Sequence, residues 1–109
     1  SPRRERWANR TLEQIIESAC CHFGSLRTEV FAHHREMRTN ASMLAFLLVA
    51  SWHTPHIDGC LIADFMDFAL QTTNKRLHDA KRRYAYNSTF KSDVDAIAKQ
   101  CGVRPLAVM

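Results

Sequence analysis

Residues 43–50 read Met-Leu-Ala-Phe-Leu-Leu-Val-Ala, and every one of them is apolar. A helix that is apolar on all sides is stable only when other elements surround it, because it has no face for water. The run is also far shorter than the roughly 20 apolar residues that a membrane-spanning helix needs. The sequence therefore predicts a central buried helix from about Asn40 to His53, with the rest of the chain packed around it.

The composition indicates a single helical domain. The chain has 109 residues, of which 46% are hydrophobic and 24% are charged, as in ordinary soluble proteins with one core. It contains only three Gly and three Pro, and runs of β-branched residues are scarce. We expect an all-α fold of five or six helices. Its parts would be a flexible basic lead-in over 1–9, a helical domain over 10–102 and a tail over 103–109.

The segment before the central helix carries a clear helical pattern. Thr11 and Gln14 have the spacing of a capping box, which predicts the start of a helix. Apolar residues then recur at helical spacing from Leu12 to Phe23, and Gly24 follows as the expected stop. A short second helix is expected from Leu26 to about Ala32.

Two further helices are expected after the central one, around a more basic segment. Pro55 should prevent the central helix from continuing. A helix from about Ile57 to Asp67 would place its apolar residues inward and its three aspartates outward. After the basic segment, Asn87 or Ser88 should cap a last helix, which Gly102 would end.

The basic segment is Thr72–Tyr86, TTNKRLHDAKRRYAY, and it also predicts a helix. Its inward stripe is narrow and consists of Leu77, Ala80 and Tyr84. The hydroxyl of Thr72 or Thr73 could cap its start. With the preceding helix and a short turn near Gln71, it would form a helix-turn-helix, although the usual turn glycine is absent.

The polar residues of this helix suit contact with DNA. In a helix-turn-helix the start of the second helix approaches base edges, where Asn pairs with adenine and Lys or Arg with guanine. The net charge of +4 agrees with a polyanionic partner. A solvated amphipathic helix is the alternative for this segment alone. The expected DNA-binding residues in this helix are Thr72, Thr73, Asn74, Lys75, Arg76, His78 and Arg82.

Several segments together resemble the C-terminal DNA-binding domain of the bacterial replication initiator DnaA. They are LEQIIESACCHFGSLRTEVF at 12–31, HHR at 33–35, ASMLAFLLVA at 41–50, IADFMDFA at 62–69 and the inward stripe of 72–86. The resemblance implies that Arg35 enters a DNA minor groove, while Arg38 is expected to hold a phosphate. It implies the domain's fold and its binding to DNA.

The same comparison shows where this chain departs from the DnaA pattern. LQTTNKR at 70–76 stands where the family reads roughly G-G-R-D-H-T-T, and Ala41-Ser42 stands where the long helix opens with Pro-Arg. The residues that read the DnaA box are therefore replaced, and no nucleotide-binding motif is present. The resemblance fits phage-like or gene-transfer-agent transcription activators that carry this module better than a replication initiator.

We therefore expect sequence-specific binding of double-stranded DNA by a transcription regulator in a bacterial cytoplasm. The alternatives are origin binding of the replication-initiator type and a helical protein-interaction module, whose surface would be the loop around Trp52 or the tail 103–109. RNA polymerase or another regulator would be a second partner. We expect no membrane association, no small-molecule substrate and no cofactor.

The sequence offers no strong metal or catalytic motif. His53-x-x-His56-x-x-x-Cys60 has two imidazoles and a thiol, but a proline lies between the histidines and no fourth ligand is evident. The four cysteines form no CxxC pair, which favours a reducing compartment. Asp64 and Asp67 fit a solvated helix face, and no glycine-rich phosphate loop exists. We expect neither a metal site nor an enzyme.

Overall fold

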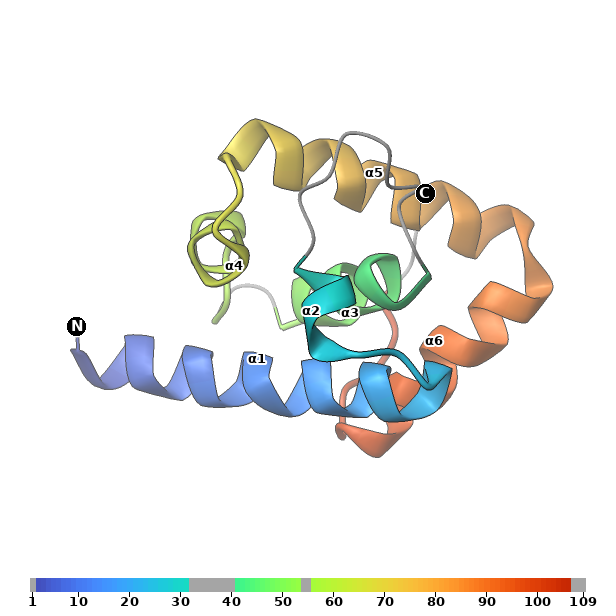
Figure 1. The fold of residues 1–109 in the computed structure, drawn as a ribbon, viewed down its shortest axis with the longest axis horizontal. Helices are drawn as coiled ribbons and strands as arrows, with labels where there is room; N and C mark the ends of the chain where they lie inside the picture. The colour runs from blue at the N-terminus through green and yellow to red at the C-terminus, as the bar shows by residue number, and fades with distance from the viewer. Residues whose placement is uncertain (1, 32–40, 54–55, 107–109) are drawn as a thin grey trace.

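The computed structural model describes residues 2–31, 41–53 and 56–106, which contain helices and no strand. The helices are α1 (Pro2–Phe23), α2 (Arg27–Val30), α3 (Ala41–Ser51), α4 (Gly59–Met66), α5 (Leu70–Tyr86) and α6 (Ser88–Gln100) (Figure 1). The expected all-α fold is confirmed, with six helices in the described residues. None of these helices combines the length and the apolar composition that a membrane span requires.

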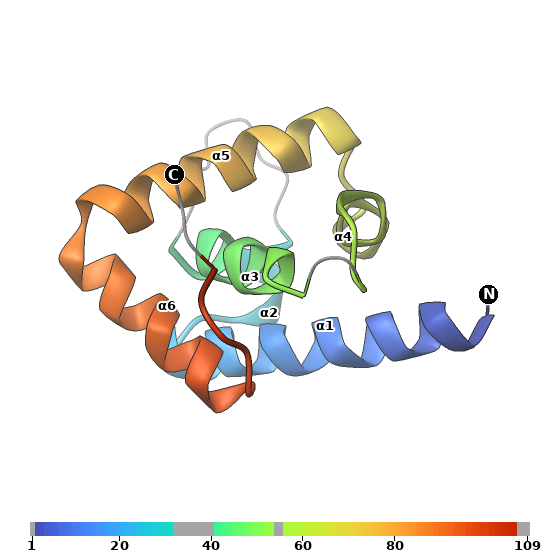
Figure 2. The ribbon, with the colours of Figure 1, turned by 180° about the vertical axis from the view of Figure 1, so that it is seen from behind.

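The central element is α3, as the apolar run predicted. Every residue of 43–50 is at most 1% exposed. The helix contacts each of the other five, and both ribbon views show it between α1 and α5 (Figures 1 and 2). An apolar helix without a polar face is thus covered on all sides, which removes its side chains from water.

Helix α1 is longer than the sequence pattern predicted. It begins at Pro2, so the expected flexible lead-in over 1–9 is wrong for the described residues, and Thr11 lies inside the helix instead of capping it. The reason is that Ala8 continues the buried stripe of Leu12 one turn earlier and is fully buried. Proline also suits a first helical turn, where its missing N–H leaves no bond unmade. The stop at Gly24 is confirmed, since its φ is 65°.

The turn between α4 and α5 forms without glycine. Asp58 caps α4, because its side chain accepts a hydrogen bond from the Leu61 N–H at 2.9 Å. At the other end, Asp67 has a left-handed conformation, with φ 56° and ψ 40°, and its N–H bonds back to the last turn of α4. Aspartate is one of the few residues besides glycine that adopt this conformation routinely. Asp67, Phe68 and Ala69 thereby complete the turn.

Helix α5 begins at Leu70, with Ala69 as its N-cap and no side-chain cap. The expected capping by Thr72 or Thr73 is therefore wrong. Thr73 is 1% exposed, and its hydroxyl donates to the Ala69 carbonyl oxygen at 3.2 Å. The buried stripe of α5 is thus one turn longer than predicted. Thr73 adds to Leu77, Ala80 and Tyr84.

The junction of α5 and α6 agrees with the prediction. The Asn87 side chain accepts a hydrogen bond from the Phe90 N–H at 2.9 Å and so caps α6. The Tyr84 hydroxyl donates to Asp95 at 2.7 Å, which ties the inner face of α5 to α6. Burial is the main cause that raises the pKa of Tyr84, so this phenol stays protonated as a donor.

Candidate nucleic-acid interface

Helices α4 and α5 have the arrangement of a helix-turn-helix. Figures 1 and 2 show α4 nearly end-on where α5 runs across the view, and the two helices are in contact. Gly59 at the start of α4 lies beside the first turns of α5. A methyl group at Gly59 would lie 3.5 Å from Leu70 Cδ1 and 3.7 Å from Asn74 Oδ1. Asn74 therefore lies on the flank of α5 next to α4 and not at the middle of its outer face.

The outer face of α5 is a polar row opposite the buried stripe. Helical spacing aligns Gln71, Lys75, His78 and Arg82, and all four are exposed. Because the helix begins at Leu70, its first turn carries Gln71 and Thr72, whereas Asn74 and Lys75 belong to the second turn. The residues nearest to the helix start are therefore different from those that the sequence pattern placed there.

The charge of the chain is concentrated on α5. This helix holds 5 of the 15 Lys and Arg residues and 1 of the 11 Asp and Glu residues, so the other residues balance at 10 of each. The net charge of +4 is thus the charge of α5. In the described part of the chain, salt bridges join His22 to Asp93, Arg27 to Glu13 and Lys91 to Asp95. Lys75, Lys81, Arg82 and Arg83 take part in none of them.

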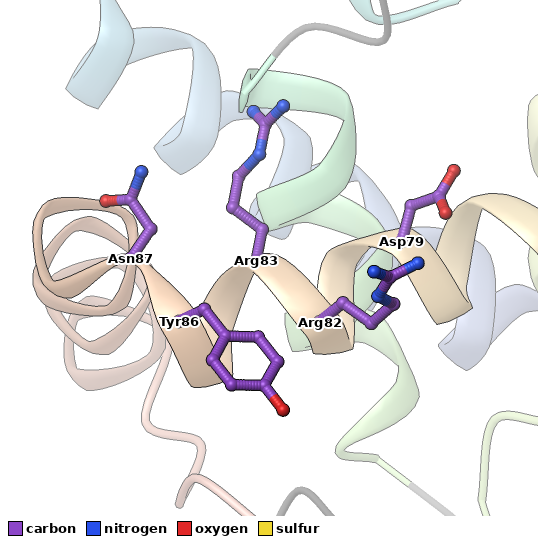
Figure 3. Close-up of a pocket in the computed structure, with 5 residues that line it drawn as sticks. All are labelled: Asp79, Arg82, Arg83, Tyr86 and Asn87. Carbon is purple, nitrogen blue, oxygen red and sulfur yellow. The ribbon is translucent and has the colours of Figure 1, made fainter.

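The C-terminal half of α5 borders a shallow hollow of about 340 Å³. Its walls are Asp79, Arg82, Arg83, Tyr86 and Asn87 (Figure 3). Arg83 and Asn87 point to one side of the helix, while the Tyr86 ring points to the other (Figure 3). The Arg83 guanidinium lies 5.6 Å from the centroid of the Phe90 ring, and Tyr86 is 87% exposed.

A second hollow, of about 280 Å³, borders the N-terminal half of α5. Thr72, Lys75, Arg76 and Asp79 line it, so Asp79 lies on the border of both hollows. An anion in either hollow would meet a pair of cationic side chains and be repelled by the same carboxylate.

The structure brings together most of the residues that the sequence singled out. Thr72, Asn74, Lys75, His78 and Arg82 lie on the exposed side of α5, and Arg76 is half-buried at its flank. Thr73 is the exception, because its side chain is buried and cannot reach DNA from its present position. Arg35 and Arg38 lie outside the described residues.

Sequence reasoning missed four exposed residues near the end of α5, namely Lys81, Arg83, Tyr86 and Asn87. The expected docking mode directs attention to the start of a second helix, and these residues lie at its end. The run Lys-Arg-Arg at 81–83, followed by an aromatic residue outside the inward stripe, was the signal for them.

The suggested zinc ligands do not form a cluster in the structure. Among the described residues, no group of three His, Cys, Asp or Glu side chains could hold a metal ion. The four cysteines are free thiols. His53 is half-buried, and burial, followed by the neighbouring His56, lowers its pKa.

No protein-family model, no curated protein and no solved structure matches this chain.

Proposed function

We propose that this protein binds double-stranded DNA in a sequence-specific manner through α4 and α5, as a bacterial transcription regulator in the cytoplasm. The observation that carries the proposal is the concentration of the net positive charge on the exposed side of one helix, the second helix of a helix-turn-helix. Phosphate neutralisation supplies most of the non-specific affinity of such proteins, and it requires cations that are not already paired.

In the proposed complex, α5 lies in the major groove, which is wide enough to admit a helix. Gln71, Thr72 and Lys75 would approach the base edges, since they lie on the exposed side of the first two turns. A glutamine can make two hydrogen bonds to adenine, and a lysine can donate to guanine. Arg82 and Arg83 would contact phosphates further along the helix.

The resemblance to the DnaA domain supports the same docking but not the same operator. Origin binding of the replication-initiator type would use this surface too, so the operator sequence distinguishes it from transcription regulation. A protein-interaction module without DNA binding is the alternative from a different class. It would leave the concentration of positive charge on α5 without a role. The proposal includes no catalytic activity, cofactor or small-molecule substrate.

The proposal can be tested by selecting bound sequences from a random duplex library. Affinities for the selected duplex and for a scrambled duplex are then compared by fluorescence anisotropy. Gln71→Ala and Lys75→Ala should each reduce the preference for the selected duplex by about 1–3 kcal/mol, because each removes a direct contact with a base. Lys99→Gln removes an exposed cation from α6 and should leave the preference unchanged. Failure to enrich any sequence would contradict sequence-specific binding.

A further inference from the structure

A hollow on another part of the surface is lined by aromatic rings. Its volume is about 250 Å³, and its walls are Trp7, Trp52, His53, His56, Gly102, Val103 and Arg104, which we call the indole hollow. These residues come from α1, from the residues that follow α3 and from the segment after α6. None of them borders the two hollows of α5. The fold therefore assembles a second concave surface that the proposed DNA interface does not use.

The two indoles have different roles in this hollow. Trp52 is 6% exposed and packs edge-on against Tyr84 of α5, with ring centroids 5.5 Å apart. Trp7 is 44% exposed. Its ring is held by edge contacts to His53 and His56, with centroids 6.2 Å and 6.0 Å away. A large aromatic side chain that is held in place but left half in water is typical of an anchor point at a protein interface.

The polar groups of the hollow favour an acidic occupant. Among the described residues, its walls include Arg104 and no Asp or Glu. A negative charge on an occupant would therefore be attracted to Arg104.

The size of the hollow favours a side chain over a cofactor. Sites for drug-sized molecules occupy roughly 300–1,000 Å³ and enclose most of the ligand. At about 250 Å³, the indole hollow has room for a single large side chain and the backbone beside it. Indoles provide the apolar wall for such a side chain, and Arg104 can reach a neighbouring carboxylate.

We propose that the indole hollow binds a short segment of a partner protein in which an apolar side chain is flanked by Asp or Glu. The apolar side chain lies between Trp7 and Trp52. The carboxylate pairs with Arg104. This surface is separate from the DNA-binding face of α5, so a partner can be bound while DNA occupies α5.

The chain contains its own reporter for this binding, because both of its tryptophans line the indole hollow. The probe is the synthetic peptide acetyl-Glu-Leu-Asp-Phe-Glu-Leu-amide, titrated into the full chain while tryptophan emission is recorded. The control peptide replaces each Glu by Gln and the Asp by Asn. We expect saturable quenching or a spectral shift with the acidic peptide, and at least tenfold weaker binding of the control peptide.

Three variants locate the binding. Arg104→Gln should weaken the acidic peptide about tenfold, the effect of one charge-assisted contact. Trp7→Ala should weaken both peptides, and a heteronuclear NMR titration replaces the emission signal for this variant. Lys99→Gln, which removes an exposed cation at the end of α6, should stay within twofold of the parent. Trp52 is left unchanged, because it also contacts Tyr84.

Three results would overturn the proposal. One is equal binding of the acidic and neutral peptides, and another is unchanged binding of the acidic peptide by Arg104→Gln. The third is displacement of the acidic peptide by saturating duplex DNA, which would mean that the peptide binds the cations of α5. Circular dichroism checks that each variant is folded. If Trp7→Ala does not fold, Arg104→Gln and the DNA competition still decide the question.

Discussion

Thr73 provides the sharpest test of the structure against the sequence pattern, because the pattern predicts a base contact and the structure buries the side chain. We expect Thr73→Val to leave the preference for the selected duplex unchanged within twofold. The substitution removes the hydroxyl bond to the Ala69 carbonyl, but that oxygen keeps its bond from the Thr73 N–H at 3.0 Å. No polar group is left unsatisfied, so stability should change by only about 1 kcal/mol.

The size of the change in duplex preference distinguishes a buried Thr73 from a Thr73 that contacts a base. A base contact from Thr73 would be worth roughly 1–3 kcal/mol, which is a loss of about 5-fold to 150-fold in preference. Thr73→Lys should behave differently from Thr73→Val. It would force an ammonium group into the space between α5 and the core, and we expect it to lower stability by several kcal/mol.

The assay combines anisotropy with selected and scrambled duplexes and urea denaturation followed by circular dichroism. Thr72→Val makes the same change in chemistry at the exposed neighbour in the same turn, where the proposed docking predicts a loss of preference. The reasoning would be refuted if Thr73→Val kept the parent's stability but lost the preference for the selected duplex. It would be refuted equally if Thr73→Lys folded with unchanged stability.

Three further predictions concern stability. Leu47→Ala should lower the free energy of unfolding by about 3–5 kcal/mol, since Leu47 is fully buried in a helix that others surround. The control Leu26→Ala, at a side chain that is 67% exposed, should change it by less than about 0.5 kcal/mol. Equal urea midpoints for the two variants would contradict this prediction. Asn87→Ala should cost about 1 kcal/mol by removing the cap of α6, as measured by thermal unfolding, and no loss would argue against the cap. Because the folded state holds the pKa of His53 below its ordinary value of 6.5, stability should fall as the pH drops below about 6.5, where the unfolded chain takes up the proton first. His53→Gln should weaken that dependence in urea titrations at several pH values, and an unchanged profile would contradict the assignment.

The sequence predicted the centre of the fold well. An apolar run without a polar face leaves only burial as an outcome, and Met43–Ala50 is buried throughout. Asn87, one of the two caps predicted for the last helix, and the stop at Gly24 were also identified, because capping by asparagine and a left-handed glycine are local effects. These features depend on short stretches of chain, so the sequence alone contains the information.

Helix starts were predicted less well, because they depend on contacts that sequence spacing does not contain. Thr11 has the local pattern of a cap, but packing of Ala8 against the core extends α1 to Pro2. Likewise, Asp67 adopts a left-handed conformation that ends α4 without a glycine. Helix α5 then begins at Leu70, two residues before the expected Thr72. In both cases tertiary packing or an uncommon backbone conformation overrides the local signal.

The error at the start of α5 carried over to the candidate interface. Because α5 begins two residues before the expected Thr72, its buried stripe extends one turn further, and Thr73 joins it four residues before Leu77. Thr73 moved from the expected reading face to the core, and Gln71 entered the first turn. Lys75, His78 and Arg82 are exposed as predicted, because the buried stripe has the helical period that the sequence indicated.

The salt dependence of DNA binding tests the central claim most directly. The measurement compares the slope of log Kd against log salt concentration for the parent, for Arg82→Gln/Arg83→Gln and for Arg10→Gln/Lys99→Gln, which removes two exposed cations outside α5. Each lost phosphate contact reduces the slope by about 0.9, so the α5 variant should lose about 2 units and the control variant none. Equal slopes for the parent and the α5 variant, or an equal loss in the control, would contradict the assignment of α5 as the DNA-binding face.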